Sequence, residues 1–113
     1  MATDIRAELK NCGVSAQKVR LVVNLVRGKP AVAAMDQLRF LPKIAAFHVR
    51  KVVASAVANA EENFGVSRDE LYIYRITADE APTRKWRRFG ARGRFKPLLR
   101  RSSHITVVLR EHE

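Results

Sequence analysis

A run of basic residues near the carboxyl end of the chain carries the clearest chemistry in the sequence. Residues 84–101 contain nine Lys or Arg side chains and no Asp or Glu. These bases are Arg84, Lys85, Arg87, Arg88, Arg92, Arg94, Lys96, Arg100 and Arg101. Seven of the nine are arginines, whose planar guanidinium groups bind phosphate oxygens and stack on nucleobases. The run therefore predicts a polyanionic partner.

Three aromatic residues, Trp86, Phe89 and Phe95, are interleaved with these bases. Aromatic rings stack on unpaired bases, so the combination indicates a folded RNA with irregular clefts. A charged run can instead form a solvated face, with its aromatic residues packed against the core. The absence of any acid over these 18 residues favours nucleic acid.

The composition of the rest of the chain indicates an ordinary folded domain. The chain has 113 residues and a net charge of +11, but outside residues 84–101 the net charge is only +2. The length and the 47% of hydrophobic residues predict a single domain with a small core. A lone Cys12 excludes an internal disulfide and agrees with a reducing cytoplasm. We expect no membrane insertion, because the apolar stretches are far shorter than a membrane span.

Some residues outside the run offer weaker signals for nucleic acid. Arg20, Arg27 and Lys29 could extend a phosphate-binding footprint from the first helix, or they could only keep the surface soluble. Tyr72 and Tyr74 share one face of a predicted strand. They could stack on bases, but packing at the core or at the sheet edge is the competing interpretation.

No group of residues has the spacing of a catalytic or metal site. The histidines and the cysteine are scattered: Cys12, His48, His104 and His112. Asp79 and Glu80 are adjacent in an extended segment, where neighbouring side chains point to opposite faces and do not converge. Ser102, Ser103 and His104 lack a placed acid, and no glycine motif for phosphate binding is present. We therefore expect no enzymatic activity, no metal and no cofactor.

The hydrophobic periodicity predicts the elements that must position the basic run. Alternation predicts strands over 4–10, 71–78 and 104–110, and helical spacing predicts helices from Ser15 to Gly28, over 31–39 and over 43–64. Ser15 is expected to cap the first helix, and Gly28 and Gly65 to end the first and third. Three helices on a small antiparallel three-stranded sheet make an α+β fold.

Two of these elements have a predicted face. The long helix is expected to bury Ala46, Val49, Val53, Val57, Ala60 and Phe64. The strand over 71–78 is expected to place Tyr72, Tyr74, Ile76 and Ala78 on one face.

Residues 79–103 must connect the last two strands. A structureless loop of that length is uncommon in a compact domain, so the connection is predicted to be an extended hairpin that turns near residues 90–93. At about 3.3 Å per residue, arms of about eleven residues reach about 35 Å. The expected organisation is a single domain over 1–113, with a globular body over 1–80 and 102–113 and a basic hairpin over 81–101.

Short blocks along the chain resemble the L twenty-two family of bacterial-type large-subunit ribosomal proteins. They are SAQKVRLV at 15–22 leading to RGK at 27–29, SAVANAE at 55–61, DEAP at 79–82, ARGR at 91–94 and SHITVV at 103–108. The blocks occur in the family order over nearly the whole chain, which makes the resemblance specific. One departure lies at Phe89-Gly90, where the family usually has Pro-Arg.

The resemblance implies a structural role in the cytoplasmic ribosome, without enzymatic activity. The small body would lie near the mouth of the peptide exit tunnel, and the hairpin would thread through ribosomal RNA, support subunit assembly and line the tunnel. Partners would be large-subunit ribosomal RNA, ribosomal protein L four at a narrowing of the tunnel, and the nascent peptide.

The same resemblance implies which residues would meet these partners. RNA contacts would come from Arg84, Lys85, Trp86, Arg87, Arg88, Arg92, Arg94, Lys96, Arg100 and Arg101, together with Lys18, Arg20, Arg27 and Lys29. The tip in the tunnel would be Phe89, Gly90, Ala91, Arg92, Gly93 and Arg94.

Two other function classes remain open at this point. A DNA-bending architectural protein also uses a basic β-arm, usually with an apolar wedge at its tip. Such a protein would prefer duplex DNA to folded RNA. A small ribonuclease would need a convergent pair of histidines or carboxylates, and it would show turnover on RNA.

Overall fold

The computed structural model describes residues 4–89 and 95–111, with side chains for residues 4–82 and 101–111. The elements are β1 (Ile5–Cys12), α1 (Ala16–Val26), α2 (Ala31–Arg39), α3 (Ile44–Phe64), the single 3-10 turn η1 (Arg68–Glu70), β2 (Leu71–Phe89) and β3 (Phe95–Glu111). Within the described residues, three α-helices accompany one three-stranded antiparallel sheet. The predicted α+β class is confirmed.

Local sequence signals set the ends of the helices. Gly28 has a φ of 79° and Gly65 a φ of 64°, a left-handed conformation that favours glycine and ends α1 and α3. The Gly65 N–H donates a hydrogen bond to the carbonyl of Ala60. Ser15 occupies the N-cap position of α1, as its place in the sequence predicts, and Pro30 occupies the N-cap position of α2. The Ser15 hydroxyl, however, makes no capping hydrogen bond.

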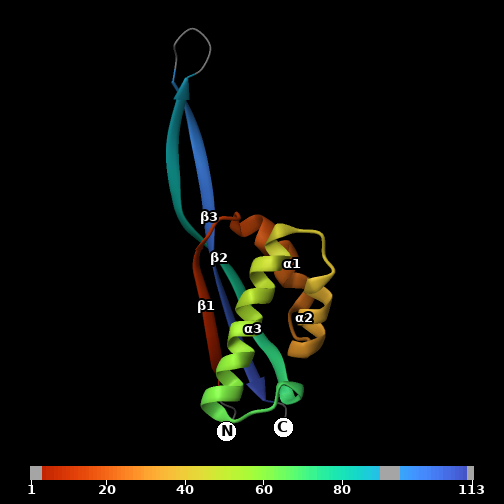
Figure 1. The fold of residues 1–113 in the computed structure, drawn as a ribbon. Helices are drawn as coiled ribbons and strands as arrows, with labels where there is room; N and C mark the ends of the chain where they lie inside the picture. Colours follow the sequence, from red (N-terminus) through yellow and green to blue (C-terminus); the bar gives the residue numbers. More distant parts are fainter. Residues whose placement is uncertain (1–3, 90–94, 112–113) are drawn as a thin grey trace.

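The helices cover one face of the sheet (Figure 1). β3 is the central strand, with β1 and β2 on its two sides. Leu109 of β3 is the Cα partner of Ile5 on one side and of Ile73 on the other. All three residues are buried, and the apolar faces of α1 and α3 pack against them to form the core.

The apolar face of α3 matches the prediction except at its last residue. Ala46, Val49, Val53, Val57 and Ala60 are buried. Phe64 is 50% exposed, so the prediction that it joins the core is wrong. Phe64 is the final residue of α3, where the chain turns away at Gly65, and no further helical turn covers it.

A β-bulge changes which residues of β2 face the core. Ile73 pairs with Leu109 but Arg75 pairs with Val108, so Tyr74 is an extra residue on β2. Ile73 is buried before the bulge and Ile76 after it. The prediction that Tyr74 and Ile76 share a face is therefore wrong, because the extra residue reverses the alternation of side chains.

β2 and β3 continue as a long hairpin beyond the end of β1 (Figure 1). Their pairing reaches Phe89 and Phe95, with a second register shift between Ala81 and Arg84. The molecule measures 64 × 25 × 19 Å and its radius of gyration is 17.1 Å, whereas a compact chain of this length has about 13 Å. The projecting hairpin is thus as predicted, and its predicted turn at 90–93 lies outside the described residues.

Candidate nucleic-acid interface

The hairpin pairs basic residues with basic residues along its backbone. Arg84 is the Cα partner of Arg100, and Arg88 is the Cα partner of Lys96. Like charges directly opposite each other destabilise an antiparallel pair, and residues 84–101 contain no acid to offset them. A two-stranded ribbon is only marginally stable in water even without such repulsion. The hairpin therefore suits a partner that supplies negative charge, as a phosphate backbone does.

Most of the hairpin residues predicted to bind RNA lie on the paired strands β2 and β3. β2 carries Arg84, Lys85, Trp86, Arg87 and Arg88, and β3 carries Lys96, Arg100 and Arg101. Trp86 pairs with Leu98, and Phe89, the last residue of β2, pairs with Phe95. The rest of the predicted tip, residues 90–94, lies outside the described residues.

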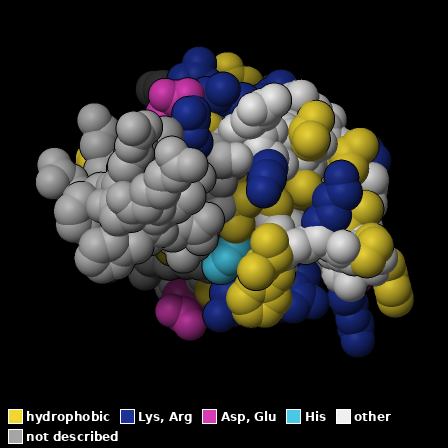
Figure 2. All heavy atoms as spheres, turned by 90° about the horizontal axis from the view of Figure 1, so that it is seen from above, with side chains coloured by type: hydrophobic (Ala, Val, Ile, Leu, Met, Phe, Trp, Pro, Cys, Tyr) yellow, Lys and Arg dark blue, Asp and Glu magenta, His cyan; other side chains and the backbone are white. Residues whose placement is uncertain are grey.

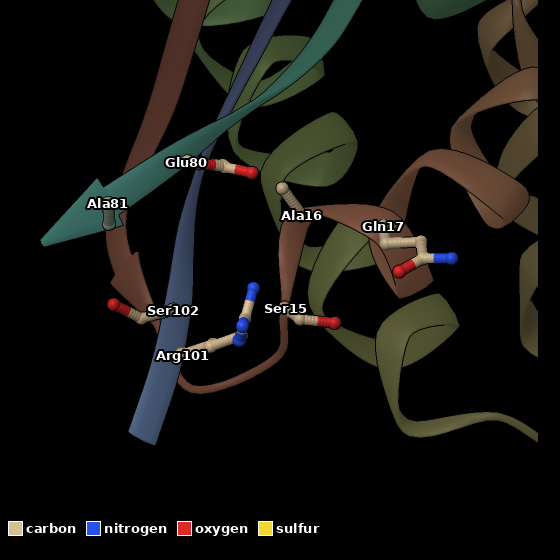
Figure 3. Close-up of a pocket in the computed structure, with 7 residues that line it drawn as sticks. All are labelled: Ser15, Ala16, Gln17, Glu80, Ala81, Arg101 and Ser102. Carbon is tan, nitrogen blue, oxygen red and sulfur yellow. The ribbon is translucent and has the colours of Figure 1, made fainter. Parts of the chain in front are cut away.

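A polar pocket of about 280 Å³ lies where the hairpin leaves the sheet. Its lining residues are Ser15, Ala16, Gln17, Glu80, Ala81, Arg101 and Ser102. Figure 3 shows Arg101 reaching from β3 toward Ser15 and Glu80 reaching from β2 toward the start of α1. Since the Glu80 carboxylate opposes an anion that Arg101 would attract, the pocket is not by itself a phosphate site.

Two of the arginines predicted to bind RNA, Arg20 in α1 and Arg27 directly after it, bind the protein's own backbone. The Arg20 Nε donates to the carbonyl of Ala78 at 2.9 Å, and the Arg27 Nη2 donates to the carbonyl of Ile76 at 3.0 Å. Both carbonyls belong to β2, which is an edge strand of the described sheet. A guanidinium group has five N–H donors, so both arginines keep further donors that could bind a phosphate.

The connection between α1 and α2 protects the same side of β2. The Gly28 N–H donates to the carbonyl of Ile73 at 3.1 Å, and the Ile73 N–H donates to the carbonyl of Lys29 at 2.9 Å. Open sheet edges invite pairing with other chains, and proteins cover them with loops or charged residues. Arg20 and Arg27 thus have a structural task that sequence reasoning missed, because the sequence pattern does not reveal which strand lies at the edge of the sheet.

The two lysines of the predicted footprint differ in their surroundings. The Lys29 Nζ donates to the Gln37 side chain at 2.6 Å. Lys18 makes no hydrogen bond or ion pair with the part of the chain whose side chains are described, and it borders a shallow groove together with Lys43. Lys18 is therefore better placed than Lys29 to meet an external anion.

The described residues hold no group of three or more His, Cys, Asp or Glu side chains that could bind a metal. The Nδ1 atom of His104 accepts a hydrogen bond from the Asn11 N–H at 3.0 Å, so the partner of this histidine is a backbone amide and not a carboxylate. The hydrogen bond to Asp4 raises the pKa of Arg110, which is already fully charged at neutral pH. No described helix is long and apolar enough to cross a membrane.

Comparison with known proteins places nearly the whole chain in one family. The family described as "Ribosomal protein L22p/L17e" matches residues 7–110. A relative from a Thermoanaerobacter species is 47% identical over 97% of this chain and 99% of its own length. A relative from Dehalococcoides mccartyi is 51% identical over 94% of this chain and 97% of its own. One from Pediococcus pentosaceus is 44% identical over 98% of this chain and 94% of its own. All three are named "Large ribosomal subunit protein uL22".

Proposed function

The chain belongs to the ribosomal protein L22p/L17e family, and from this membership we propose that its hairpin binds ribosomal RNA and lines the nascent-peptide exit tunnel. The family consists of structural proteins of the ribosome, so the chain is a component of the large subunit in the cytoplasm and not an enzyme. Support of subunit assembly follows from the same proposal, because a hairpin that contacts several RNA segments holds them together.

The observation that carries the proposal is the pairing of Arg84 with Arg100 and of Arg88 with Lys96. Each pair costs stability in the free protein. Ribosomal RNA offsets this cost, because each phosphate neutralises the Lys or Arg side chain that it contacts. The RNA then releases the counterion that this phosphate had held. The aromatic residues of the hairpin, Trp86, Phe89 and Phe95, would stack on unpaired bases or fill gaps in the RNA.

The body sets the direction in which the hairpin leaves. β2 and β3 pass from the buried sheet into the hairpin without ending. At the junction, the buried Ser103 hydroxyl donates to the carbonyl of Val14 at 2.8 Å, and the Ser102 hydroxyl donates to the carbonyl of Pro82 at 3.2 Å. These bonds support a division into a body over 1–80 and 102–113 and a hairpin over 81–101. In this division the body fixes the angle at which the hairpin enters the RNA.

The proposal includes the partners at the tip. Residues 89–94 would lie at a narrowing of the tunnel, beside ribosomal protein L four and the passing nascent peptide. This part rests on the family membership and on the reach of the hairpin, which contributes to the 64 Å length of the molecule.

Crosslinking from the hairpin tests the RNA contact directly. A photoreactive residue replaces Trp86, Gly90 or Phe95 in the full chain, and the variants are assembled into large subunits and irradiated. Sequencing of the attached RNA should return a few defined segments of large-subunit ribosomal RNA. Competition with duplex DNA provides the control. A preference for the duplex over ribosomal RNA, or the absence of RNA from all three crosslinks, would contradict the proposal.

A further inference from the structure

The acidic residues of the body are distributed unevenly along the chain. Between Glu8 and Glu61 the sequence holds nine Lys or Arg residues and a single acid, Asp36. Several of the remaining acids, Glu61, Glu62, Asp69, Glu70 and Glu111, lie in segments that end near the chain termini. In Figure 1, α3 runs from the hairpin end of the body to the end that holds both termini. The end of the body that holds the termini is therefore rich in acids, whereas the end beside the hairpin combines bases such as Lys18 and Lys43 with the acids Asp79 and Glu80.

The end of the body beside the hairpin contains an apolar groove between α1 and α3. Val14, Lys18, Leu21, Lys43, Ile44 and Ala45 line this α1–α3 groove, which has a volume of about 310 Å³. Two of its apolar residues are open to solvent, Leu21 with 59% and Ile44 with 70% exposure, whereas Val14 and Ala45 are buried. Clusters of exposed apolar residues on the surface of a protein often mark a site of interaction with another molecule. The two lysines stand at the rim of the groove.

An aromatic ring with its own cations lies next to the groove. Phe47 follows Ile44 by one turn of α3 and is 44% exposed. The Lys51 Nζ lies 4.7 Å and the Arg50 guanidinium 5.9 Å from the centre of its ring. Figure 2 looks down on this end of the molecule and shows hydrophobic and basic side chains intermingled, with acidic ones only near the margin.

We propose that the α1–α3 groove binds an unpaired RNA nucleotide as a second contact beside the hairpin. The base would lie against Leu21, Ile44 and Phe47, and Lys18 and Lys43 would meet the flanking phosphates. RNA fits better than a protein helix, because the groove offers apolar surface and positive charge together and the described groove residues include no acid. The inference rests on the proposed function and deepens it by naming the partner of this face.

Photocrosslinking from α3 provides a matched pair of positions. p-Benzoylphenylalanine replaces Phe47 in one full-length variant and Phe64 in another, and both variants are assembled into large subunits. Both side chains lie on α3 with similar exposure, 44% and 50%, but Phe64 is the last residue of α3, near Glu61 and Glu62 at the end of the body that holds the termini. Position 47 should yield a crosslink to large-subunit ribosomal RNA and position 64 should not. Crosslinks to protein alone from position 47, equal RNA yields from both positions, or none from position 47 would overturn the inference.

A binding measurement gives a second, independent test with the full chain. The double variant Lys18→Gln, Lys43→Gln should lower the steepness of the log–log dependence of affinity on salt by about 1 to 2 units, for a purified transcript of large-subunit ribosomal RNA. The control double variant, Arg6→Gln with Arg75→Gln, removes two exposed bases from β1 and β2 and should leave the steepness unchanged. Equal steepness in the two variants would contradict binding at the groove.

The same experiments separate this inference from the proposed function. If the crosslinks from Trp86 and Phe95 reach RNA while those from Phe47 do not, only the groove proposal fails. If the hairpin positions also fail to reach RNA, the proposed function fails.

Discussion

The Arg27 guanidinium donates a hydrogen bond of 3.0 Å to the backbone carbonyl of Ile76, which joins the end of α1 to the outer side of β2. The same guanidinium donates to the Asn24 side chain at 2.9 Å, so its direction is fixed from within the helix. Arg20, two turns earlier in α1, binds the Ala78 carbonyl in the same way. Two residues whose type suggests RNA binding thus also hold the body together.

Replacement of Arg27 should therefore destabilise the free protein. In Arg27→Met the apolar stem is kept and the donors are lost, which should lower the free energy of unfolding by about 1–2 kcal/mol. Urea titration without RNA measures this loss. Lys18→Met is the control, because Lys18 makes no hydrogen bond with described residues, and its effect should stay within about 0.5 kcal/mol. Equal losses in the two variants would show that the bond to Ile76 does not stabilise the fold.

The base of the hairpin offers a pair of neighbouring serines. Ser103 is 0% exposed and its hydroxyl donates to the carbonyl of Val14 at 2.8 Å. Ser103→Ala should cost about 1–2 kcal/mol, because it leaves a buried carbonyl without this donor. Ser102→Ala removes a bond that is exposed to solvent and should cost less than about 0.5 kcal/mol. Thermal unfolding of the two variants compares them, and the reverse order of stability would refute this assignment.

The end of α3 depends on a left-handed residue. Gly65 has a φ of 64° and nothing within 4 Å of where a Cβ would lie. Gly65→Ala should therefore lower stability by about 1–2 kcal/mol through backbone strain alone. Gly13 has the same open surroundings but no positive φ, so Gly13→Ala should be neutral or stabilise by up to about 1 kcal/mol. If both substitutions have the same effect in urea titrations, backbone strain at Gly65 is not the cause.

The charge of the hairpin should make RNA binding strongly dependent on salt. With up to nine phosphate contacts from residues 84–101, the slope of log affinity against log salt should approach about −6 to −8. Filter binding or fluorescence anisotropy over a range of potassium chloride concentrations measures this slope. A flat response would refute the electrostatic account of binding.

Removal of the hairpin should leave a folded body. Ala81 and Ser102 are Cα partners, so replacing residues 82–101 by Asn-Gly would close the strands with a tight turn. Circular dichroism should retain the helical signal and urea unfolding should stay cooperative, while the shortened chain should fail to enter large subunits. Loss of cooperative unfolding would show that the hairpin is needed for the body to fold.

Helix ends and the hairpin could be predicted because local residues determine them. Gly28 and Gly65 can adopt positive φ because they lack a Cβ, and Pro30 suits the start of a helix because its ring fixes φ. The hairpin follows from the length of chain that must connect two strands. These features depend on neighbours in sequence, which are visible without a structure.

The bulge at Tyr74 and the bonds of Arg20 and Arg27 could not be predicted in the same way. The bulge is set by the pairing of β2 with β3, and the alternation of residues 71–78 contains no sign of an extra residue. The arginines bind β2 because the strand order places it at the edge of the sheet. Strand order is a property of the assembled fold, so the sequence pattern indicated exposed bases and left their contacts unspecified.

The central position of β3 has a consequence for how the protein is made. Ile5 has its sheet partner at Leu109, so β1 has nothing to pair with until almost the whole chain has been synthesised. β2 also cannot form its strand pairing until β3 has been synthesised. The helices can form earlier, but the sheet closes only after translation is nearly complete. A chain released before β3 is made would expose two unpaired strands, a state that is prone to aggregate and that protein quality control would have to remove.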